Sequence, residues 1–286
     1  MIEQFHKNPT QQKDQFVVAY IADLEQSHAV VSYALYFTRM LKKGLILLHV
    51  SDPRYTAQAP AEAEPRLQQI RRNLPQGDAI SYAALKGNTK EVINVLPTLL
   101  NAVLVVAHVS ANAKRKSPTH PKRLLRDFSE CKVAYLTVQE PMVSPRALSN
   151  VAFTVNYKKE AKDKYIWSSY FARFFGSTVH ALHYDYTDEI LKRKWYDNMR
   201  FLHRLYAALG INFTSHVITS KSTFEDINAL HFSVDNHYDL LLCLTTKERD
   251  ALELFIGVQE NYLVVNSHHL PILFLNPRED LYVICD

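Results

Sequence analysis

Glycine is scarce in this sequence, with six residues among 286. None lies between Asn88 and Phe175. A backbone phosphate cradle needs left-handed dihedrals and close approach of the ligand, so none is expected in that segment. Cysteine is also scarce, and the three residues show no CxxC or other metal-binding spacing. We interpret them as reduced core or terminal thiols.

Long apolar runs and catalytic signatures are missing as well. No stretch approaches the ~20 residues that span a bilayer, and the polar start lacks a signal-peptide core. We therefore expect a cytoplasmic protein with no membrane segment. The sequence has no serine elbow, HExxH motif or paired carboxylates, which argues against an enzyme and nominates no catalytic residue. The formal charge of +4 is too small to indicate nucleic acid binding.

Histidine spacing gives no metal site. His180 and His183 are three residues apart on an expected strand, so they point to opposite faces and cannot share an ion. His268 and His269 form a loop pair without a third ligand nearby in the sequence. We predict that the protein binds no metal.

Strands and helices are expected to alternate along the chain. Short apolar runs bounded by polar residues or proline predict buried parallel strands, and the segments between them predict crossover helices. In the first half, strands are expected at Phe16–Ala22, Leu45–Val50, Ala79–Leu85, Val103–Val109 and Val133–Val138. Helices are expected after Ser27 to near Gly44, around Leu67–Leu74, and from a cap at Thr89 to about Leu100. The alternation predicts a doubly wound α/β fold.

The second half repeats the pattern of the first. GLILLHV is echoed by STVHALHY, NAVLVVAHV by HYDLLLCLT, and CKVAYLTV by LPILFLNP. A repeat this long is typical of a duplicated domain. Polar residues and two prolines interrupt the apolar pattern at Gln139–Ser149. The predicted domains are therefore residues 1–143 and 150–286.

The stretch Tyr238–Leu275 carries a resemblance to a known family. An Asp precedes one apolar strand, and a proline leads into a second, as in the last third of a universal stress protein domain. That family holds ATP phosphates in a loop of Gly, two residues, Gly, nine residues, Gly and a hydroxyl residue. Here Leu244 and Lys247 replace the first two glycines, Gly257 is kept, and Val258 replaces the hydroxyl residue. The nucleotide-binding motif is degenerate.

The first half resembles the same family at other positions. Its first strand leads into Asp23, where the family has an Asp that meets the adenine, and its second strand ends in LHV, which contains His49. In the second half Asn156 or Tyr157 stands at the Asp position. The chain is similar to a tandem universal stress protein. The resemblance implies two similar Rossmann-like, doubly wound domains, each a mainly parallel five-stranded sheet flanked by helices, related by a pseudo-twofold axis.

The segment Ala113–Arg126 has six Lys or Arg residues and no acid, where the family's phosphate loop would run. Side-chain cations can bind an anion here, with Thr119 at the family's hydroxyl position. The alternative is a solvated loop stiffened by Pro118 and Pro121. No aromatic residue lies among these cations, so nucleic acid binding is not expected.

Two functions stay open. The first is a non-catalytic stress-response protein that acts through an unidentified protein partner or dimerisation, without a cofactor or tight ATP binding. The second is an adenine-nucleotide-binding protein that uses the first domain for ATP, either without hydrolysis or as a slow ATPase. The candidate cofactor-binding residues are Asp23, His49, His108, Thr119, Lys247 and Gly257. The structural alternatives are an Asx turn for Asp23 and a core side chain for His49.

The resemblance also implies a way for the two domains to pair. Universal stress proteins commonly associate through their last strands, and a linker of about ten residues spans some 30 Å. We therefore expect Val133–Val138 to lie beside Ile272–Leu275 within one chain. A homodimer stays open.

Overall fold

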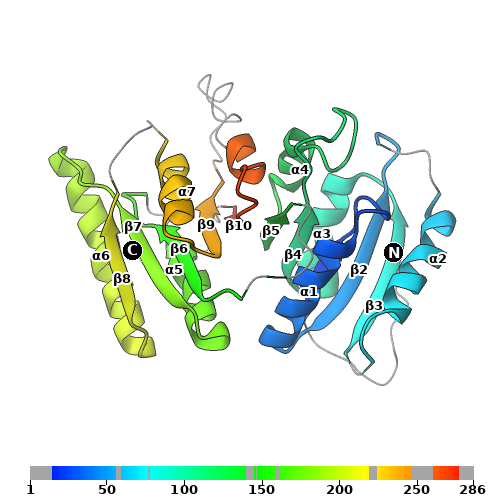
Figure 1. Cartoon of the computed structure of the whole chain (residues 1–286), viewed down its shortest axis with the longest axis horizontal. Helices are drawn as coiled ribbons and strands as arrows, with labels where there is room; N and C mark the ends of the chain where they lie inside the picture. The colour runs from blue at the N-terminus through cyan, green and yellow to red at the C-terminus, as the bar shows by residue number, and fades with distance from the viewer. Residues whose placement is uncertain are drawn as a thin grey trace. The chain divides into compact units, whose positions relative to one another are not determined.

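The structure is a computed structural model that describes residues 15–55, 59–76, 78–139, 145, 147–158, 162–218, 224–245 and 260–276. Contacts divide the chain into two compact units, an N-terminal unit, Met1–Pro145, and a C-terminal unit, Arg146–Asp286. Each contains parallel strands and helices (Figure 1). The prediction of an α/β fold with parallel strands flanked by helices is confirmed.

The N-terminal unit has strand order β3-β2-β1-β4-β5, with parallel neighbours throughout. Its strands are β1 (Phe16–Tyr20), β2 (Gly44–Ser51), β3 (Ile80–Lys86), β4 (Ala102–His108) and β5 (Ala134–Val138). Its helices are α1 (His28–Leu41), α2 (Pro60–Arg72), α3 (Thr89–Leu100) and α4 (Pro121–Phe128). The order reverses direction between β1 and β4, and ligands of such sheets bind beyond the carboxyl ends of the strands at this point.

The core of this unit follows from the apolar runs in the sequence. Every residue of β1 and β2 is buried, as expected of a strand with helices on both faces. Helix α1 turns Val30, Ala34 and Phe37 inward at helical spacing. Burying each large apolar side chain contributes about 1.5–3 kcal/mol to the stability of the fold. The packed strands and helix therefore hold the loops at the carboxyl edge in position.

Two local predictions were wrong. The end of the basic segment is not a solvated loop, because α4 buries Leu124 and Phe128, and Pro121 suits the first turn of a helix. Asn88 rather than Thr89 caps α3, since its side-chain oxygen accepts a hydrogen bond from the backbone N–H of Lys90. The expected end of the first helix near Gly44 is confirmed, since α1 ends at Leu41 with a left-handed C-cap at Lys42.

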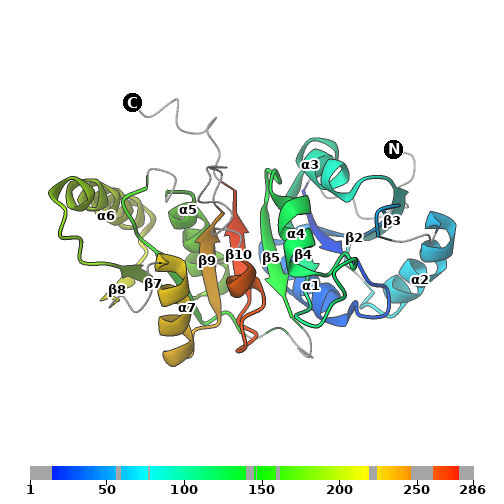
Figure 2. The same ribbon diagram turned by 90° about the horizontal axis from the view of Figure 1, so that it is seen from above.

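The C-terminal unit has strand order β10-β9-β6-β7-β8, again parallel. Its strands are β6 (Asn150–Thr154), β7 (Thr178–His183), β8 (Phe213–Val217), β9 (Leu240–Leu244) and β10 (Ile272–Leu275). Its helices are α5 (Lys162–Tyr170), continued by a π-helical turn η3 (Phe171–Phe175), α6 (Glu189–Leu209) and α7 (Glu225–Asp235). Figure 2 shows α7 on the opposite face of these strands from α5 and α6. Among the described residues, no helix has the length and apolar content to cross a membrane.

Candidate functional site

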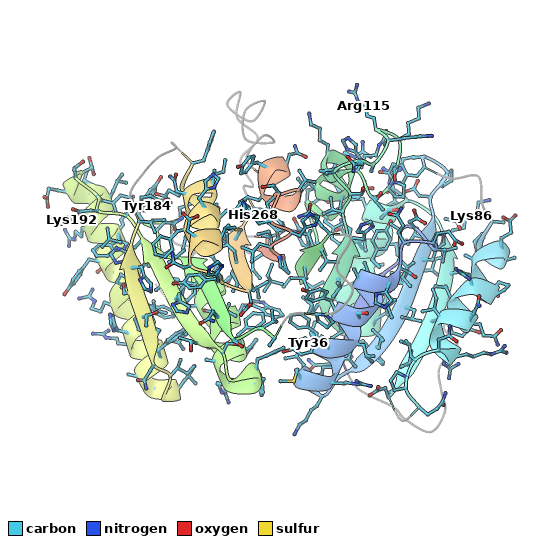
Figure 3. The ribbon with its side chains drawn as sticks, in the orientation of Figure 1. Tyr36, Lys86, Arg115, Tyr184, Lys192 and His268 are labelled. Atoms are coloured by element: carbon cyan, nitrogen blue, oxygen red, sulfur yellow. The ribbon has the colours of Figure 1, made fainter. Side chains whose placement is uncertain are left out.

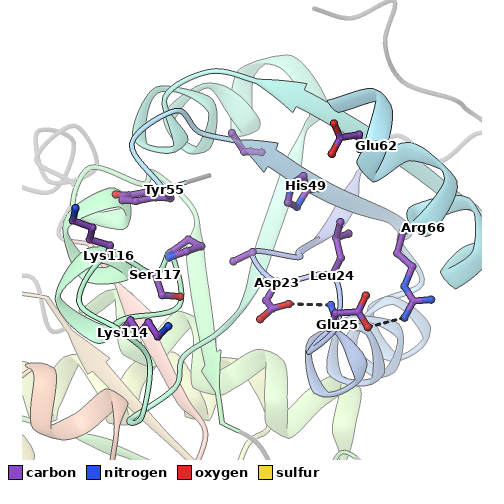
Figure 4. A pocket seen from close by; sticks show the side chains of 13 residues that line it. Asp23, Leu24, Glu25, His49, Tyr55, Glu62, Arg66, Lys114, Lys116 and Ser117 are labelled. Atoms are coloured by element: carbon purple, nitrogen blue, oxygen red, sulfur yellow. Dashed lines mark hydrogen bonds and ion pairs between the residues drawn. The ribbon is translucent and has the colours of Figure 1, made fainter. Parts of the chain in front are cut away.

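A cavity of about 640 Å³ lies at the carboxyl ends of β1 and β2 in the N-terminal unit. Its walls come from the loops after these strands, from α2 and from the loop before α4 (Figure 4). The polar and ionisable residues that line the cavity include Asp23, His49, Tyr55, Lys114, Lys116 and Ser117. This volume lies within the roughly 300–1,000 Å³ of small-molecule sites, and this edge is where parallel α/β sheets bind ligands.

Asp23 is fixed on the cavity wall by a local turn. Its Oδ1 accepts a hydrogen bond from the backbone N–H of Glu25 at 2.9 Å. The Asx turn expected as the structural alternative is therefore present, and the same side chain lines the cavity (Figure 4). The turn and a binding role are compatible, because one carboxylate has four lone-pair sites.

His49 lines the cavity and holds a buried hydrogen-bond acceptor in a fixed orientation. The side chain is 3% exposed, and its Nδ1 lies 2.8 Å from the carbonyl oxygen of Ile21. A carbonyl only accepts, so Nδ1 carries the proton. Burial lowers the pKa of His49, against the hydrogen bond to Ile21 and the charge of Asp23. The ring is neutral at pH 7, and Nε2 is a buried lone pair without a partner among the described residues.

The opposite wall is cationic. Lys114, Lys116 and Ser117 come from the loop before α4 and face Glu62 and Arg66 across the cavity (Figure 4). Ammonium and hydroxyl groups together can bind an anion such as a phosphate. In Figure 3 Arg115, from the same loop, projects outward from the unit.

Tyr55 ties this loop region to the end of β2. Its hydroxyl donates to Asp127 of α4 and accepts a hydrogen bond from Arg126 at 2.6 Å. The guanidinium carbons of Arg54 and Arg123 lie 5.0 and 4.9 Å from its ring centroid, within cation–π range. Burial, with the Asp127 carboxylate, raises the pKa of Tyr55, so the phenol stays protonated.

Asp52 connects the loop after β2 to the start of α3. It is 1% exposed and accepts hydrogen bonds from the Arg54 side chain and from the backbone N–H of Thr89 at 2.7 Å. Burial alone would raise its pKa, but these hydrogen bonds outweigh burial and hold the pKa of Asp52 well below its usual range. Neither Asp52 nor Tyr55 is among the candidate residues predicted from the sequence. Both follow a predicted strand closely, as Asp23 does, and this position at the carboxyl edge of the sheet could have marked them as candidate site residues.

The other candidate residues lie in different places. Thr119 is buried, and its hydroxyl lies 2.8 Å from that of Ser117. Ser117, and not Thr119, is among the residues that line the cavity. His108 is buried at the end of β4 and is not among the residues that line the cavity. Lys247 and Gly257 lie outside the described residues.

The corresponding edge of the C-terminal unit has different chemistry. Asn156 Oδ1 accepts a hydrogen bond from Lys158 N at 3.2 Å, the turn that Asp23 makes in the N-terminal unit, so Asn156 rather than Tyr157 takes this position. Lys164 is fully buried, and its Nζ donates to the Thr154 hydroxyl at the end of β6. Among the described residues, no three or more His, Cys, Asp or Glu side chains lie together in a group that could hold a metal ion.

Comparison with known proteins finds similarity in structure only. No protein-family model matches the sequence, and no curated protein matches it. A universal stress protein from Archaeoglobus fulgidus superposes with a TM-score of 0.67 at 13% identity, over 94% of this chain and 98% of that chain. This chain has the universal stress protein fold. At such low identity the likeness establishes the fold alone.

Two other solved structures show the same likeness. A putative universal stress protein from Pseudomonas aeruginosa gives a TM-score of 0.62 at 13% identity, over 94% of this chain and 95% of its own. The cytoplasmic domain of a prokaryotic cation chloride cotransporter gives 0.53 at 12% identity, over 93% and 96%. The fold therefore occurs in proteins described by different roles, and function has to be argued from the site.

Proposed function

We propose that the chain is a cytoplasmic, universal stress protein-like stress-response protein that binds a small anionic ligand in its N-terminal unit. It carries out no reaction and acts through a protein partner. Of the two functions left open by the sequence, the geometry favours ligand binding, with an adenine nucleotide as the ligand. One observation carries this: a single cavity is lined by the His49 acceptor, the Asp23 carboxylate and the cations of Lys114 and Lys116.

Each part of an adenine nucleotide has a complement in the cavity. The phosphates require cations and a hydroxyl donor, which Lys114, Lys116 and Ser117 supply. Ribose hydroxyls donate to a carboxylate, and Asp23 provides one. The exocyclic amine of adenine donates hydrogen bonds, and the lone pair of His49 Nε2 accepts them.

The phosphates are held by side chains rather than by a glycine-rich backbone loop. Ordering a long Lys side chain costs up to about 2 kcal/mol of rotamer entropy. Binding is therefore weaker than in a protein with the complete glycine motif. A modest affinity suits a protein that responds to changes in ligand concentration.

The test compares two double variants of the full chain that remove the same charge. Calorimetric titration with Mg-ATP should show binding by the wild type and at least about a tenfold loss in Lys114→Ala/Lys116→Ala, because charge-assisted hydrogen bonds contribute roughly 1.5–3 kcal/mol each. Lys122→Ala/Lys132→Ala changes exposed cations that do not line the cavity and should bind like the wild type. Equal affinity in both variants contradicts the proposed site.

A second measurement separates the two functions left open. The purified protein is denatured, and the ultraviolet spectrum and mass of any released small molecule are recorded. A stoichiometric adenine nucleotide supports the ligand proposal. An empty protein that also gives no heat with Mg-ATP returns the preference to a partner-binding protein without a ligand.

The two units are further proposed to be similar domains related by a pseudo-twofold axis, paired through Val133–Val138 and Ile272–Leu275. In support, both have the same internal strand order, and β5 and β10 each have one neighbour inside their own unit. An uncovered strand edge favours association. Cysteine pairs introduced into these two strands should form cross-links within one chain, and cross-links only between chains would contradict the pairing.

A further inference from the structure

Two histidines from neighbouring strands of the C-terminal unit converge at one point. His180 of β7 and His216 of β8 bring Nδ1 and Nε2 to 3.4 Å of each other. His180 is paired with Thr214 in the parallel register, and His216 follows Thr214 by two residues, so all three side chains lie on one face. The Thr214 hydroxyl lies 2.6 Å from His180 Nδ1 and 3.1 Å from His216 Nε2.

The His180 ring is held in one orientation and one tautomer. Its Nε2 lies 3.1 Å from the side-chain oxygen of Asn150, and an amide oxygen accepts, so Nε2 carries the proton. The ring stacks on Tyr238 with centroids 4.1 Å apart and an angle of 19°. At pH 7.5, above the ordinary imidazole pKa of about 6.5, Nδ1 therefore offers a lone pair toward His216.

This arrangement has the features of a metal site. Zinc–imidazole bonds of about 2.0–2.1 Å in tetrahedral geometry place two ligand nitrogens roughly 3.3 Å apart, close to the 3.4 Å between the two rings. A ligating histidine characteristically donates its second N–H to a fixed acceptor, and Asn150 is that acceptor for His180.

We propose that His180 and His216 bind a divalent transition-metal ion of the imidazole-preferring class, Zn²⁺, Cu²⁺ or Ni²⁺, through Nδ1 and Nε2. The ion replaces the hydrogen bonds that the Thr214 hydroxyl makes to both rings and the 3.4 Å contact of the Tyr238 hydroxyl with His216 Nε2. Thr214 is exposed and His216 is partly exposed, so water completes the coordination from the open side. With two protein nitrogens, the affinity is below that of a four-ligand structural zinc site.

Sequence spacing gave no sign of this pair. His183, closer to His180 along the chain, points to the opposite face as predicted, whereas His216 is 36 residues away and is brought near by the β7–β8 register. The proposed ion site lies in the C-terminal unit and does not depend on ligand binding in the N-terminal unit.

The test uses tag-free full-length protein freed of metal with a chelator. Calorimetric titration with Zn²⁺ should give one equivalent per chain, and His216→Gln should weaken this binding by at least about tenfold, the lower end of the loss seen when the surroundings of a metal ligand are altered. His203→Gln is the matched control, because His203 is exposed on α6 and contacts Phe213 of the same strand. The control should bind like the wild type.

A spectroscopic readout on the wild type tests the site even where a variant does not fold. The paramagnetic resonance spectrum of one equivalent of Cu²⁺ on the wild type should show coupling to two imidazole nitrogens, and His216→Gln should show one. Equal Zn²⁺ affinity in wild type and a folded His216→Gln overturns the proposal. So does a single coupled nitrogen in the wild type, or a loss of binding in His268→Gln/His269→Gln instead.

Discussion

The hydroxyl of Tyr55 donates a hydrogen bond to the carboxylate of Asp127, which lies 72 residues further along the chain. This contact joins the loop after β2 to α4, and the loop that precedes α4 carries Lys114 and Lys116. Asp127 is 3% exposed, so hydrogen-bond donors of the protein, rather than water, must stabilise its carboxylate. The contact thereby connects two of the segments that line the cavity, the one after β2 and the one that leads into α4.

The first prediction concerns this contact. Tyr55→Phe removes the donor to Asp127 and the acceptor for Arg126, and should lower the free energy of unfolding by about 1–2 kcal/mol, because a hydrogen bond to a charged group is lost. Urea unfolding measures the change. Tyr196→Phe is the control, since Tyr196 is 60% exposed, and it should have little effect. Equal stability of Tyr55→Phe and the wild type would show that the contact contributes nothing.

The second prediction concerns acid stability. The folded-state pKa of Asp52 is depressed, so its contribution is fully present above the ordinary carboxyl pKa of about 3.9 and is lost as the pH falls below that value. Asp52→Asn should cost about 2 kcal/mol at pH 7, and the difference from wild type should shrink between about pH 4 and pH 2. Urea unfolding across this range tests it. A difference independent of pH contradicts the assignment.

The strands could be predicted from the sequence because buried parallel strands are short, continuous apolar runs. Leu45–Val50 and Val103–Val109 each match an observed strand within one residue. The helix Pro121–Phe128 was missed because its charged residues suggested solvent, although Leu124, Leu125 and Phe128 have the spacing of a buried face.

The site was predictable only in part. Asp23 and His49 follow or end strands, and position along a strand can be read from sequence. Tyr55 and Asp127 meet through an arrangement of two loops that no local pattern encodes. The pairing of His180 with His216 likewise depends on strand register, which sequence spacing does not give.

The third prediction concerns the buried lysine of the C-terminal unit. Burial lowers the pKa of Lys164, while the unfolded chain binds that proton up to about pH 10.4. The unfolded state therefore holds more protons between the two values, and stability should rise with pH across this window. Lys164→Met should flatten the rise at pH values below about 10.4, and at pH 7 it should be neutral or stabilising by about 1 kcal/mol.

The control for this comparison is Lys192→Met, on the exposed side of α6 (Figure 3). It should retain the pH slope of the wild type in urea unfolding. If Lys164→Met keeps the same slope as the control, the lysine is not the group that titrates between the folded and unfolded states.

The last prediction is that the chain binds one adenine nucleotide rather than two. The sequence resemblance implies that Leu244 and Lys247 stand where universal stress proteins have the glycines of a phosphate loop, and Val258 where they have a hydroxyl residue. Forcing an ordinary residue into a sparsely allowed conformation costs about 1–3 kcal/mol, so two such positions reduce affinity roughly 30-fold or more. Losing a hydroxyl donor costs about 1 kcal/mol further.

Two variants of the full chain show which unit holds the bound nucleotide. Calorimetry with Mg-ATP should give one equivalent for the wild type and none for Asp23→Ala/Lys114→Ala/Lys116→Ala, because that variant removes the carboxylate and both cations of the N-terminal cavity. Leu244→Gly/Lys247→Gly/Val258→Ser restores the family residues and should add binding in the C-terminal unit. If the first variant still binds one equivalent with wild-type affinity, the nucleotide lies in the C-terminal unit, and the argument from lost glycines is wrong.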